Sequence, residues 1–456
     1  MIYTGINLGI IASAIIIILG VSQNISVGIL LMACWLLFVI ISLTKGYSIK
    51  SIFEMSILGG RKSFVVVEIL LLIGAVTGAW MVSGTIPGIV YYSLHFIQPN
   101  TFILLTFIIC CAVSFLLGSA TGTASVVGLP LIIIARGGDV NLNIAAGAII
   151  AGVYFGDRCS PMSSSAALVA NLTDTNLFQN IRNMLYSSLA PFILSLGFYY
   201  ELSRLNPLKV GNNNLPQEIL RTFKIEYLVL IPIVVILVLS FRKISIKYSM
   251  FLSVFAAFVI AVIVQGYPPL EVMKDILFGF KLNSHSFLQN ILAGGGVISM
   301  VKACVIVFIA CCLAGILEGI NAFDGIKNVL HSKKPTGPLL YGITAMLSTL
   351  TAALGCSQSI AVVMTNQIMK DCYLQENYRF ALDIENSCIL TSALIPWNVA
   401  ALLCTTTLGV SLYGFIPYAF YLYSFPMVYF LSFFFKFKEK IKKTNPDHNF
   451  NGIYPR

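Results

Sequence analysis

Long apolar runs without a charged residue recur along this chain, and they limit its fold more than any other feature. IIASAIIIILG occupies 10–20 and LLMACWLLFVIISL occupies 30–43. About 20 apolar residues in an α-helix span the hydrocarbon core of a bilayer, whereas a membrane-spanning strand alternates apolar and polar residues. The sequence therefore predicts an all-α polytopic membrane protein, with room in its 456 residues for about 10 to 13 transmembrane segments.

Charged residues make up only 10% of the sequence, against about a quarter in a typical soluble protein. So small a fraction cannot cover a surface exposed to water, which excludes most soluble enzymes, nucleic-acid binders and secreted disulfide scaffolds. The 11 cysteines lie mostly in or beside apolar runs and indicate buried free thiols. The sequence contains no HExxH, clustered His or GxSxG pattern, so we predict neither enzyme activity nor a cofactor.

The net charge of +10 comes from basic residues that flank the apolar runs. They gather at 45–62, 242–247, 327–334 and 436–443. Lys and Arg concentrate in the cytoplasmic loops of membrane proteins, so these segments are predicted to face the cytoplasm from the inner membrane of the cell. The expected partners are the lipid bilayer and a small ion or small-molecule substrate, without nucleic acid, and a homodimer is an open alternative to a monomer.

An internal repeat is indicated by landmarks that recur at a nearly constant spacing. Gly118 and Gly355 are 237 positions apart, and Pro161 and Pro396 are 235 positions apart. Such self-similarity is the sequence signature of a repeated structural unit. The predicted division is a first inverted repeat at 1–200, a linker at 201–224, a second inverted repeat at 225–435 and a basic cytoplasmic tail at 436–456.

The basic segments also predict that the two repeats are inverted. Residues 45–62 place the start of the apolar run near 64 at the cytoplasmic side, while 242–247 place the start of the run near 297 at the outer side. The two equivalent runs therefore cross in opposite directions. Inverted repeats with interrupted or re-entrant helices are the architecture of secondary transporters, and the interruptions mark the substrate site.

Four polar interruptions, at 118–125, 156–165, 355–359 and 391–398, break the apolar runs. The residues expected to break the helices are Gly118, Gly122, Pro161, Gly355, Pro396 and Trp397. Free carbonyl and hydroxyl oxygens suit a hard cation such as Na⁺, and half-helix N-termini suit a carboxylate or another anion. A cation and an organic anion therefore both remain open as substrates.

Ionisable residues within the apolar stretches are rare, and such residues are functional by default. Asp157 opens one interruption and Glu385 precedes another. The structural alternatives are an ion pair between Asp157 and the adjacent Arg158, and a solvated helix-end position for Glu385. Glu68 and Glu318 lie near expected span ends, where solvation is as plausible as function.

Three short motifs lie at or near these interruptions. They are SGTIP at 83–87, YFGDRCSPMS at 154–163 and TSALIPWN at 391–398. Together they resemble the signatures of NhaC-type Na⁺/H⁺ antiporters, a family of the wider ion transporter superfamily that includes malate/lactate antiporters. The resemblance implies a secondary antiporter of the inner membrane, with two re-entrant hairpins in a transport domain that moves beside a scaffold as an elevator.

The chain departs from that family pattern at two positions. Ser164 stands where the family usually has an Asp, and Asn386 follows Glu385 where the family often has an Asp. Asp157 and Glu385 remain as the carboxylates expected to hold Na⁺ when ionised and a proton when neutral. The loss of two carboxylates also favours the alternative of a Na⁺- or H⁺-coupled transporter or exchanger of a small carboxylate or an amino acid.

The predicted mechanism is Na⁺/H⁺ antiport by alternating access, with Na⁺ and H⁺ as the transported or coupling ions. The neutral oxygens expected to complete the ion site belong to Ser160, Ser163, Ser164, Thr391, Ser392 and Asn398. A channel is disfavoured because its pore is usually built from symmetric subunits or rings. A membrane enzyme is disfavoured because no metal or nucleophile constellation is apparent.

Overall fold

The computed structural model describes residues 2–23, 25–94, 98–209, 215–242, 244–281, 295–333, 335–373 and 376–434. Every element of regular structure in these ranges is a helix. The predicted tail at 436–456 and the 210–214 part of the predicted linker lie outside the described residues. The all-helical fold class predicted from the apolar runs is confirmed.

The helices of the first half of the chain are α1 (Ile2–Ser22), α2 (Val27–Thr44), α3 (Ile49–Arg61), α4 (Phe64–Val82), α5 (Thr85–Leu94), α6 (Phe102–Leu117), α7 (Ala120–Thr123), α8 (Leu129–Gly137), α9 (Leu142–Cys159), α10 (Ser164–Leu172), α11 (Leu177–Leu205) and α12 (Leu215–Thr222). Those of the second half are α13 (Ile231–Phe241), α14 (Ile246–Ile260), α15 (Pro269–Phe278), α17 (Val301–Gly319), α18 (Asp324–Lys333), α19 (Gly337–Gly355), α20 (Gln358–Met369), α21 (Asn377–Ile384), α22 (Leu390–Ser392), α23 (Val399–Leu408) and α24 (Phe420–Phe434). Short 3₁₀ or π segments lie at Pro99–Thr101, Ala124–Gly128, Tyr227–Leu230, Ala261–Gln265, Val297–Met300, Lys370–Cys372, Glu385–Ile389 and Ile416–Tyr418.

Seven helices of the described residues are long and apolar enough to cross a membrane, or eight if one pair bent by 98° counts as a span. They are Val27–Thr44, Phe64–Val82, Pro99–Leu117, Ala120–Gly137, Ile246–Gln265, Val297–Gly319 and Gly337–Gly355, with Pro216–Thr222 and Tyr227–Leu239 as the bent pair. This number is below about 10 to 13, and the shorter apolar helices Leu8–Val21 and Val399–Leu408 are not included in it. The fold is that of a polytopic membrane protein.

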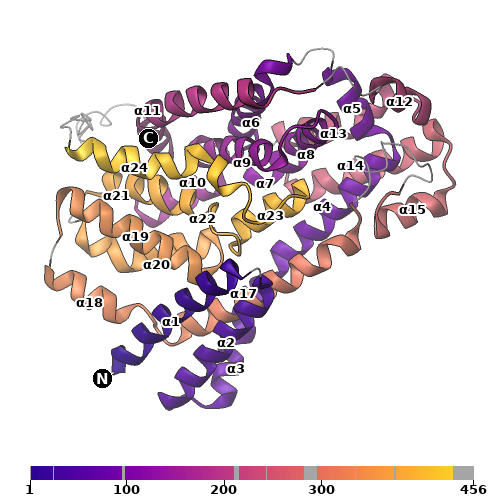
Figure 1. Ribbon diagram of the computed structural model, residues 1–456. Helices are drawn as coiled ribbons and strands as arrows, with labels where there is room; N and C mark the ends of the chain where they lie inside the picture. The colour runs from indigo at the N-terminus through magenta and orange to yellow at the C-terminus, as the bar shows by residue number, and fades with distance from the viewer. Residues whose placement is uncertain are drawn as a thin grey trace, which may run out of the picture.

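The outer face of the helices is apolar, as lipid requires. Leu8 of α1 is 65% exposed and Ile29 of α2 is 63% exposed, although both are aliphatic. In Figure 1 these two helices and α3 form one end of the molecule, while α12 and α15 lie at another. The exposed apolar side chains would aggregate in water, so the surface fits a lipid environment.

Ion pairs at the ends of α4 and α17 show how these two long helices are directed. Lys62, just before α4, pairs with Glu318 at the end of α17, with 2.6 Å between Nζ and Oε2. Glu68, near the start of α4, pairs with Lys247 near the start of α14. Helix α4 therefore begins on the side where α17 ends, which is the relation that an inverted repeat requires. Both carboxylates are more than half exposed, so the solvated alternative describes them.

Helices α4 and α17 each contain a glycine at which a shorter helix from the other half of the chain packs closely. A Cβ on Gly78 of α4 would lie 2.7 Å from the Asp275 carbonyl oxygen of α15. A Cβ on Gly315 of α17 would lie 2.4 Å from the Met55 carbonyl oxygen of α3. Small residues at helix interfaces allow such close approach in membranes. Each half thus packs a short helix against a long helix of the other half. The division of the chain at 1–200 and 225–435 stays a prediction.

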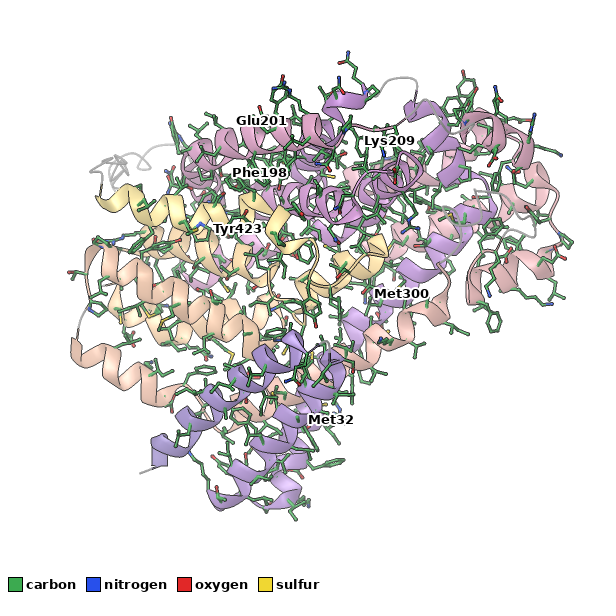
Figure 2. The ribbon with its side chains drawn as sticks, in the orientation of Figure 1. Met32, Phe198, Glu201, Lys209, Met300 and Tyr423 are labelled. Carbon is green, nitrogen blue, oxygen red and sulfur yellow. The ribbon has the colours of Figure 1, made fainter. Side chains whose placement is uncertain are left out.

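The interrupted helices pack around α9. Gly152 and Gly156 bring α9 against α6, since a Cβ on Gly156 would lie 2.1 Å from the Ser114 carbonyl carbon. On the other side, α11 and α24 meet along an aromatic seam at which Phe198 and Tyr423 lie (Figure 2). There the rings of Phe198 and Phe420 stack with centroids 4.4 Å apart. The contact at Gly156 lies near the end of α9, where the predicted site lies.

The predicted linker contains helical residues. Helix α11 continues to Leu205, and α12 occupies Leu215–Thr222. Asn206 and Pro207 follow the end of α11, as expected because the residue before a proline avoids the helical conformation. Residues 201–224 are therefore irregular over only part of their described length.

Candidate functional site

The first helix interruption is a tight turn at Gly118 between α6 and α7. Gly118 has a left-handed backbone with φ 65°, and the Ser119 hydroxyl accepts a hydrogen bond from the Gly122 N–H over 3.1 Å. A Cβ on Gly118 would lie 2.5 Å from the Met162 carbonyl carbon. Glycine suits the position because it tolerates positive φ and leaves room for the neighbouring backbone. Gly122 lies inside α7 and does not itself break the helix.

We expect Gly118→Ala to destabilise the protein by at least about 2 kcal/mol, because it combines left-handed strain with a backbone clash. The matched control is Gly197→Ala in α11, where a Cβ would meet nothing within 4 Å. Thermal unfolding of both variants in detergent measures the difference. Equal melting temperatures for the two variants would contradict this reading of the turn.

The second interruption separates α19 from α20 at residues 356–357, inside the range 355–359. Gly355 is the last residue of α19, and Cys356 takes the left-handed conformation with φ 53°. The Val399 N–H donates to the Cys356 carbonyl oxygen over 2.8 Å. A non-glycine residue with positive φ is uncommon and is held there by its surroundings.

Trp397 and Asn398 tie the last interruption to the end of α19. The Trp397 indole N–H donates to the Ala353 carbonyl oxygen over 2.7 Å, and the Asn398 amide N–H donates to the Ala352 carbonyl oxygen over 2.8 Å. These carbonyls lie in the last turn of α19, where intrahelical partners are missing. Pro396 lies in the same turn and Pro161 in the turn between α9 and α10.

Asp157 lies where interrupted elements of both halves meet. Its carboxylate accepts hydrogen bonds from the Ala120 N–H (3.4 Å) at the start of α7, the Ser165 hydroxyl (3.0 Å) in α10 and the Gln358 amide (3.1 Å) at the start of α20. The side chain is 8% exposed. The Asp157 carboxylate is thus surrounded by the starts of two half-helices and by two neutral side chains. None of its hydrogen-bond partners carries a full positive charge.

Arg158 points away from Asp157, and no ion pair joins the two among the described residues. Its guanidinium donates to the hydroxyls of Ser187 (3.0 Å) and Ser188 (2.7 Å) in α11, and to the side-chain oxygen of Asn386. It also lies over the Phe425 ring at 4.3 Å from the centroid. Successive helical residues point about 100° apart, which explains why the predicted alternative of an adjacent ion pair does not form.

Glu385 is buried at the start of the π-helical segment Glu385–Ile389 and is 1% exposed. Neither carboxylate oxygen has a hydrogen-bond partner among the described residues. Arg158 and Asp157 are the charged groups that act electrostatically on it. The alternative of a solvated helix-end position is therefore wrong, and a buried carboxylate without partners is costly to ionise.

The predicted neutral ligands have different surroundings. Ser160 and Ser163 are buried and accept hydrogen bonds from the backbone N–H groups of Met162 and Ala166, whereas Ser164 is exposed. The hydroxyls of Thr391 and Ser392 donate to carbonyl oxygens one turn earlier. The Asn398 side chain is engaged through both its oxygen and its nitrogen. Their roles as ion ligands stay predictions.

Sequence reasoning missed two side chains that contact Asp157. Ser165 follows the predicted Ser163 and Ser164, and the helical turn brings it rather than Ser164 to the carboxylate. Gln358 is 201 positions away from Asp157. Its position inside the predicted interruption 355–359 could have indicated Gln358, since the repeat predicts that interruptions from the two halves of the chain meet.

Asp383 is a further buried carboxylate, and unlike Glu385 it has hydrogen-bond partners. It accepts hydrogen bonds from the hydroxyls of Tyr373 (2.8 Å) and Tyr429 (3.0 Å) and lies 3.9 Å from the Arg379 guanidinium. In the part of the chain that the structure describes, no three His, Cys, Asp or Glu side chains group as metal ligands.

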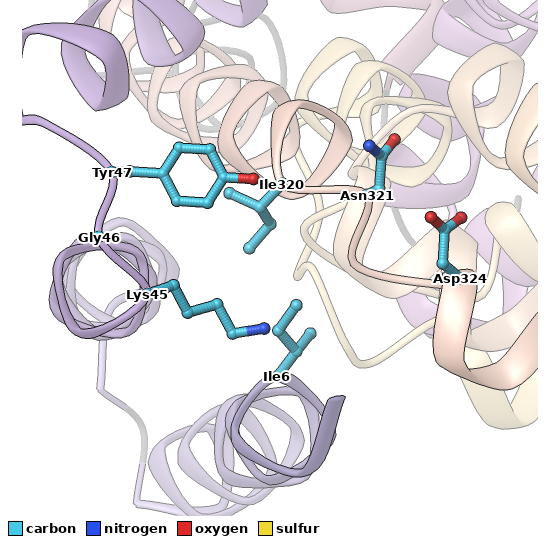
Figure 3. Close-up of a pocket in the computed structure, with 7 residues that line it drawn as sticks. All are labelled: Ile6, Lys45, Gly46, Tyr47, Ile320, Asn321 and Asp324. Atoms are coloured by element: carbon cyan, nitrogen blue, oxygen red, sulfur yellow. The ribbon is translucent and has the colours of Figure 1, made fainter. Parts of the chain in front are cut away.

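A separate cavity of about 340 Å³ lies at the end of α2, beside the turn that follows α17 (Figure 3). Lys45, Tyr47, Asn321 and Asp324 provide its polar groups. None of the predicted site residues lines it. The cavity is thus distinct from the cluster around Asp157.

Interrupted helices from two halves of one chain that converge on a buried carboxylate define a secondary transporter. The profile of the Na⁺/H⁺ antiporter family matches residues 152–437, and the chain belongs to this family. Its members are antiporters, which are transporters rather than enzymes, and the resemblance predicted from the motifs is confirmed.

Individual relatives share most of their length with this chain. It is 28% identical over 418 residues to the malate-2H⁺/Na⁺-lactate antiporter of Bacillus subtilis (strain 168), covering 89% of this chain and 88% of that protein. It is 30% identical over 371 residues to an uncharacterized Na⁺/H⁺ antiporter of Haemophilus influenzae, covering 77% and 78%. It is 28% identical over 396 residues to the Na⁺/H⁺ antiporter NhaC of B. subtilis, covering 84% and 86%.

Proposed function

We propose that this protein exchanges Na⁺ for H⁺ across the cytoplasmic membrane, with Asp157 as the main Na⁺ ligand and Glu385 as the proton carrier. The observation that carries the proposal is the carboxylate of Asp157, buried between α7, α10 and α20. Its hydrogen-bond partners stabilise a negative charge without neutralising it. A bound Na⁺ supplies the missing positive charge, and hard cations prefer oxygen ligands of this kind.

Glu385 suits the proton because its surroundings disfavour a bare negative charge. No hydrogen bond from the described residues reaches its carboxylate. When the site holds no Na⁺, a proton on Glu385 removes the cost of a buried charge. When Na⁺ arrives, its field favours the ionised form and the proton leaves. Movement of the loaded site between the two sides of the membrane then completes alternating access.

Exchange of a small organic anion is a second candidate function. The buried Arg158 guanidinium has only neutral hydrogen-bond partners among the described residues, and its Nε has none. Such a group binds carboxylates well. One relative, by its name, exchanges malate and lactate. The structure offers this candidate less support, because Arg158 is 0% exposed.

Reconstitution in liposomes with an internal pH dye separates the two functions. We expect Na⁺ added outside to change the internal pH without any organic solute, and K⁺ at the same concentration to have no effect. A response that requires malate, lactate or an amino acid would instead support the organic-anion exchanger. Liposomes without protein provide the baseline for proton leakage.

A further inference from the structure

The number of fixed charges inside the protein limits how many cations the site holds at once. Among the described residues, the charged side chains that are buried are Asp157, Arg158, Asp383 and Glu385. Asp383 lies beside Arg379 and accepts hydrogen bonds from two tyrosine hydroxyls. Arg379 also pairs with Glu376 over 2.9 Å, and this separate group of side chains, rather than the residues around Asp157, surrounds the Asp383 carboxylate. Asp157, Arg158 and Glu385 remain, and together they carry two negative charges and one positive charge.

Arg158 and Asp157 both act electrostatically on Glu385, so the three charged groups form one central cluster. The hydrogen-bond acceptors of the Arg158 guanidinium are neutral, namely the Ser187, Ser188 and Asn386 side chains, the Met184 carbonyl oxygen and the Cys159 sulfur, and the Phe425 ring lies alongside. No carboxylate lies within ion-pair distance among the described residues, whereas Asn386 is the direct neighbour of Glu385. Arginine stays protonated in proteins, so this charge is permanent throughout the transport cycle.

The central cluster is consequently one positive charge short of neutrality when both carboxylates are ionised. One proton on Glu385 restores neutrality, and so does one Na⁺ at Asp157. Two cations at once would leave an excess positive charge in a buried place, and none would leave an excess negative charge. Both states carry the large cost of an uncompensated buried charge.

We infer that the site takes up one positive charge at a time, so that one Na⁺ is exchanged for one H⁺ and transport moves no net charge. This inference rests on the proposed function and adds its stoichiometry, with Arg158 as the residue that sets it. The neutral residue Asn386, which is buried beside Glu385, fits this charge balance. A carboxylate there would add a buried negative charge and with it room for a second cation.

Transport at an imposed membrane potential tests the inference on the unmodified protein. Liposomes containing K⁺ and valinomycin are set to about +100 or −100 mV, at which each net charge moved is strongly driven or opposed. We expect the initial rate of the Na⁺-driven pH change to differ by less than about twofold between the two potentials. We also expect a tenfold Na⁺ gradient to be balanced by about one pH unit. A severalfold dependence on potential overturns the inference.

Two variants test whether Arg158 sets the stoichiometry. Asn386→Asp, which is nearly isosteric, and Arg158→Gln each make the cluster one charge more negative. We expect either one to make the exchange rate depend on potential by severalfold, while Arg158→Lys, which keeps the charge, stays insensitive. Potential-insensitive transport by a folded Asn386→Asp variant overturns the assignment to Arg158. If the variants do not fold, the measurement on the unmodified protein still decides the stoichiometry.

These outcomes are separate from those that test the proposed function. A complete lack of Na⁺-driven pH change removes the proposed function itself. A robust pH change that depends on membrane potential keeps Na⁺/H⁺ exchange and removes only the one-for-one stoichiometry. Glu318→Gln serves as the control for reconstitution, since Glu318 belongs to an exposed ion pair at the end of α17.

Discussion

Asp157→Asn is expected to reduce Na⁺-driven proton movement in liposomes by more than about 100-fold. Loss of a partner behind a metal ligand already costs about 10–100-fold, and this change removes the charged ligand itself. Asparagine keeps the size of the side chain and can still accept from Ser165 and Gln358. The fold should therefore persist while the negative charge that attracts Na⁺ is lost.

The measurement is the initial rate of the pH-dye signal after a Na⁺ pulse, normalised to the amount of reconstituted protein. Thermal unfolding in detergent shows whether the variant is folded. Asp383→Asn is the matched control for an internal carboxylate, because Asp383 contacts tyrosine hydroxyls and Arg379 rather than the elements around Asp157. A folded Asp157→Asn protein that transports at the normal rate would show that Na⁺ binds elsewhere.

Glu385→Gln is expected to abolish the Na⁺-driven pH signal for a different reason. Glutamine resembles the protonated glutamic acid but cannot release the proton, so Na⁺ entry is no longer coupled to proton exit. Some exchange of ²²Na⁺ for Na⁺ should persist because Asp157 is intact, although with weaker affinity. This residual exchange should no longer depend on pH, whereas exchange by the unmodified protein should slow as the pH falls and protons compete.

Glu385→Asp distinguishes a proton carrier from a packing residue, since it keeps an ionisable group on a shorter side chain. We expect it to retain a measurable pH signal. The assignment fails if Glu385→Gln keeps the normal dependence of ²²Na⁺ exchange on pH, because the proton would then bind to another group. The two substitutions together separate sodium binding from proton coupling, which a single loss-of-function variant cannot do.

The sequence located the broad features because they depend on local chemistry. Continuous apolar runs predicted helices, and Gly118, Pro161 and Pro396 marked three interruptions that the structure contains. It also selected Asp157 and Glu385 as buried ionisable residues, and both are buried. Whether they bind ions remains a prediction for the experiments above.

Contacts between distant segments could not be predicted in this way. The hydrogen bond from Gln358 to Asp157 depends on how two interruptions, one from each half, approach one another. The direction of Arg158 depends on the rotation of α9 against α11, and on Asn386 far along the chain. The left-handed conformation of Cys356, directly after Gly355, could not be predicted either, and its carbonyl oxygen accepts a hydrogen bond from the distant Val399 N–H.

The interruptions are held together mainly by backbone groups and capping side chains, as when Trp397 and Asn398 bind the carbonyls that end α19. The charges at the centre come from a different and much smaller set of side chains. A single substitution at one of those few positions therefore alters what the site holds without disturbing the turns that build it. The frame of the site and its charge are thus carried by different residues, and either can be altered while the other stays intact.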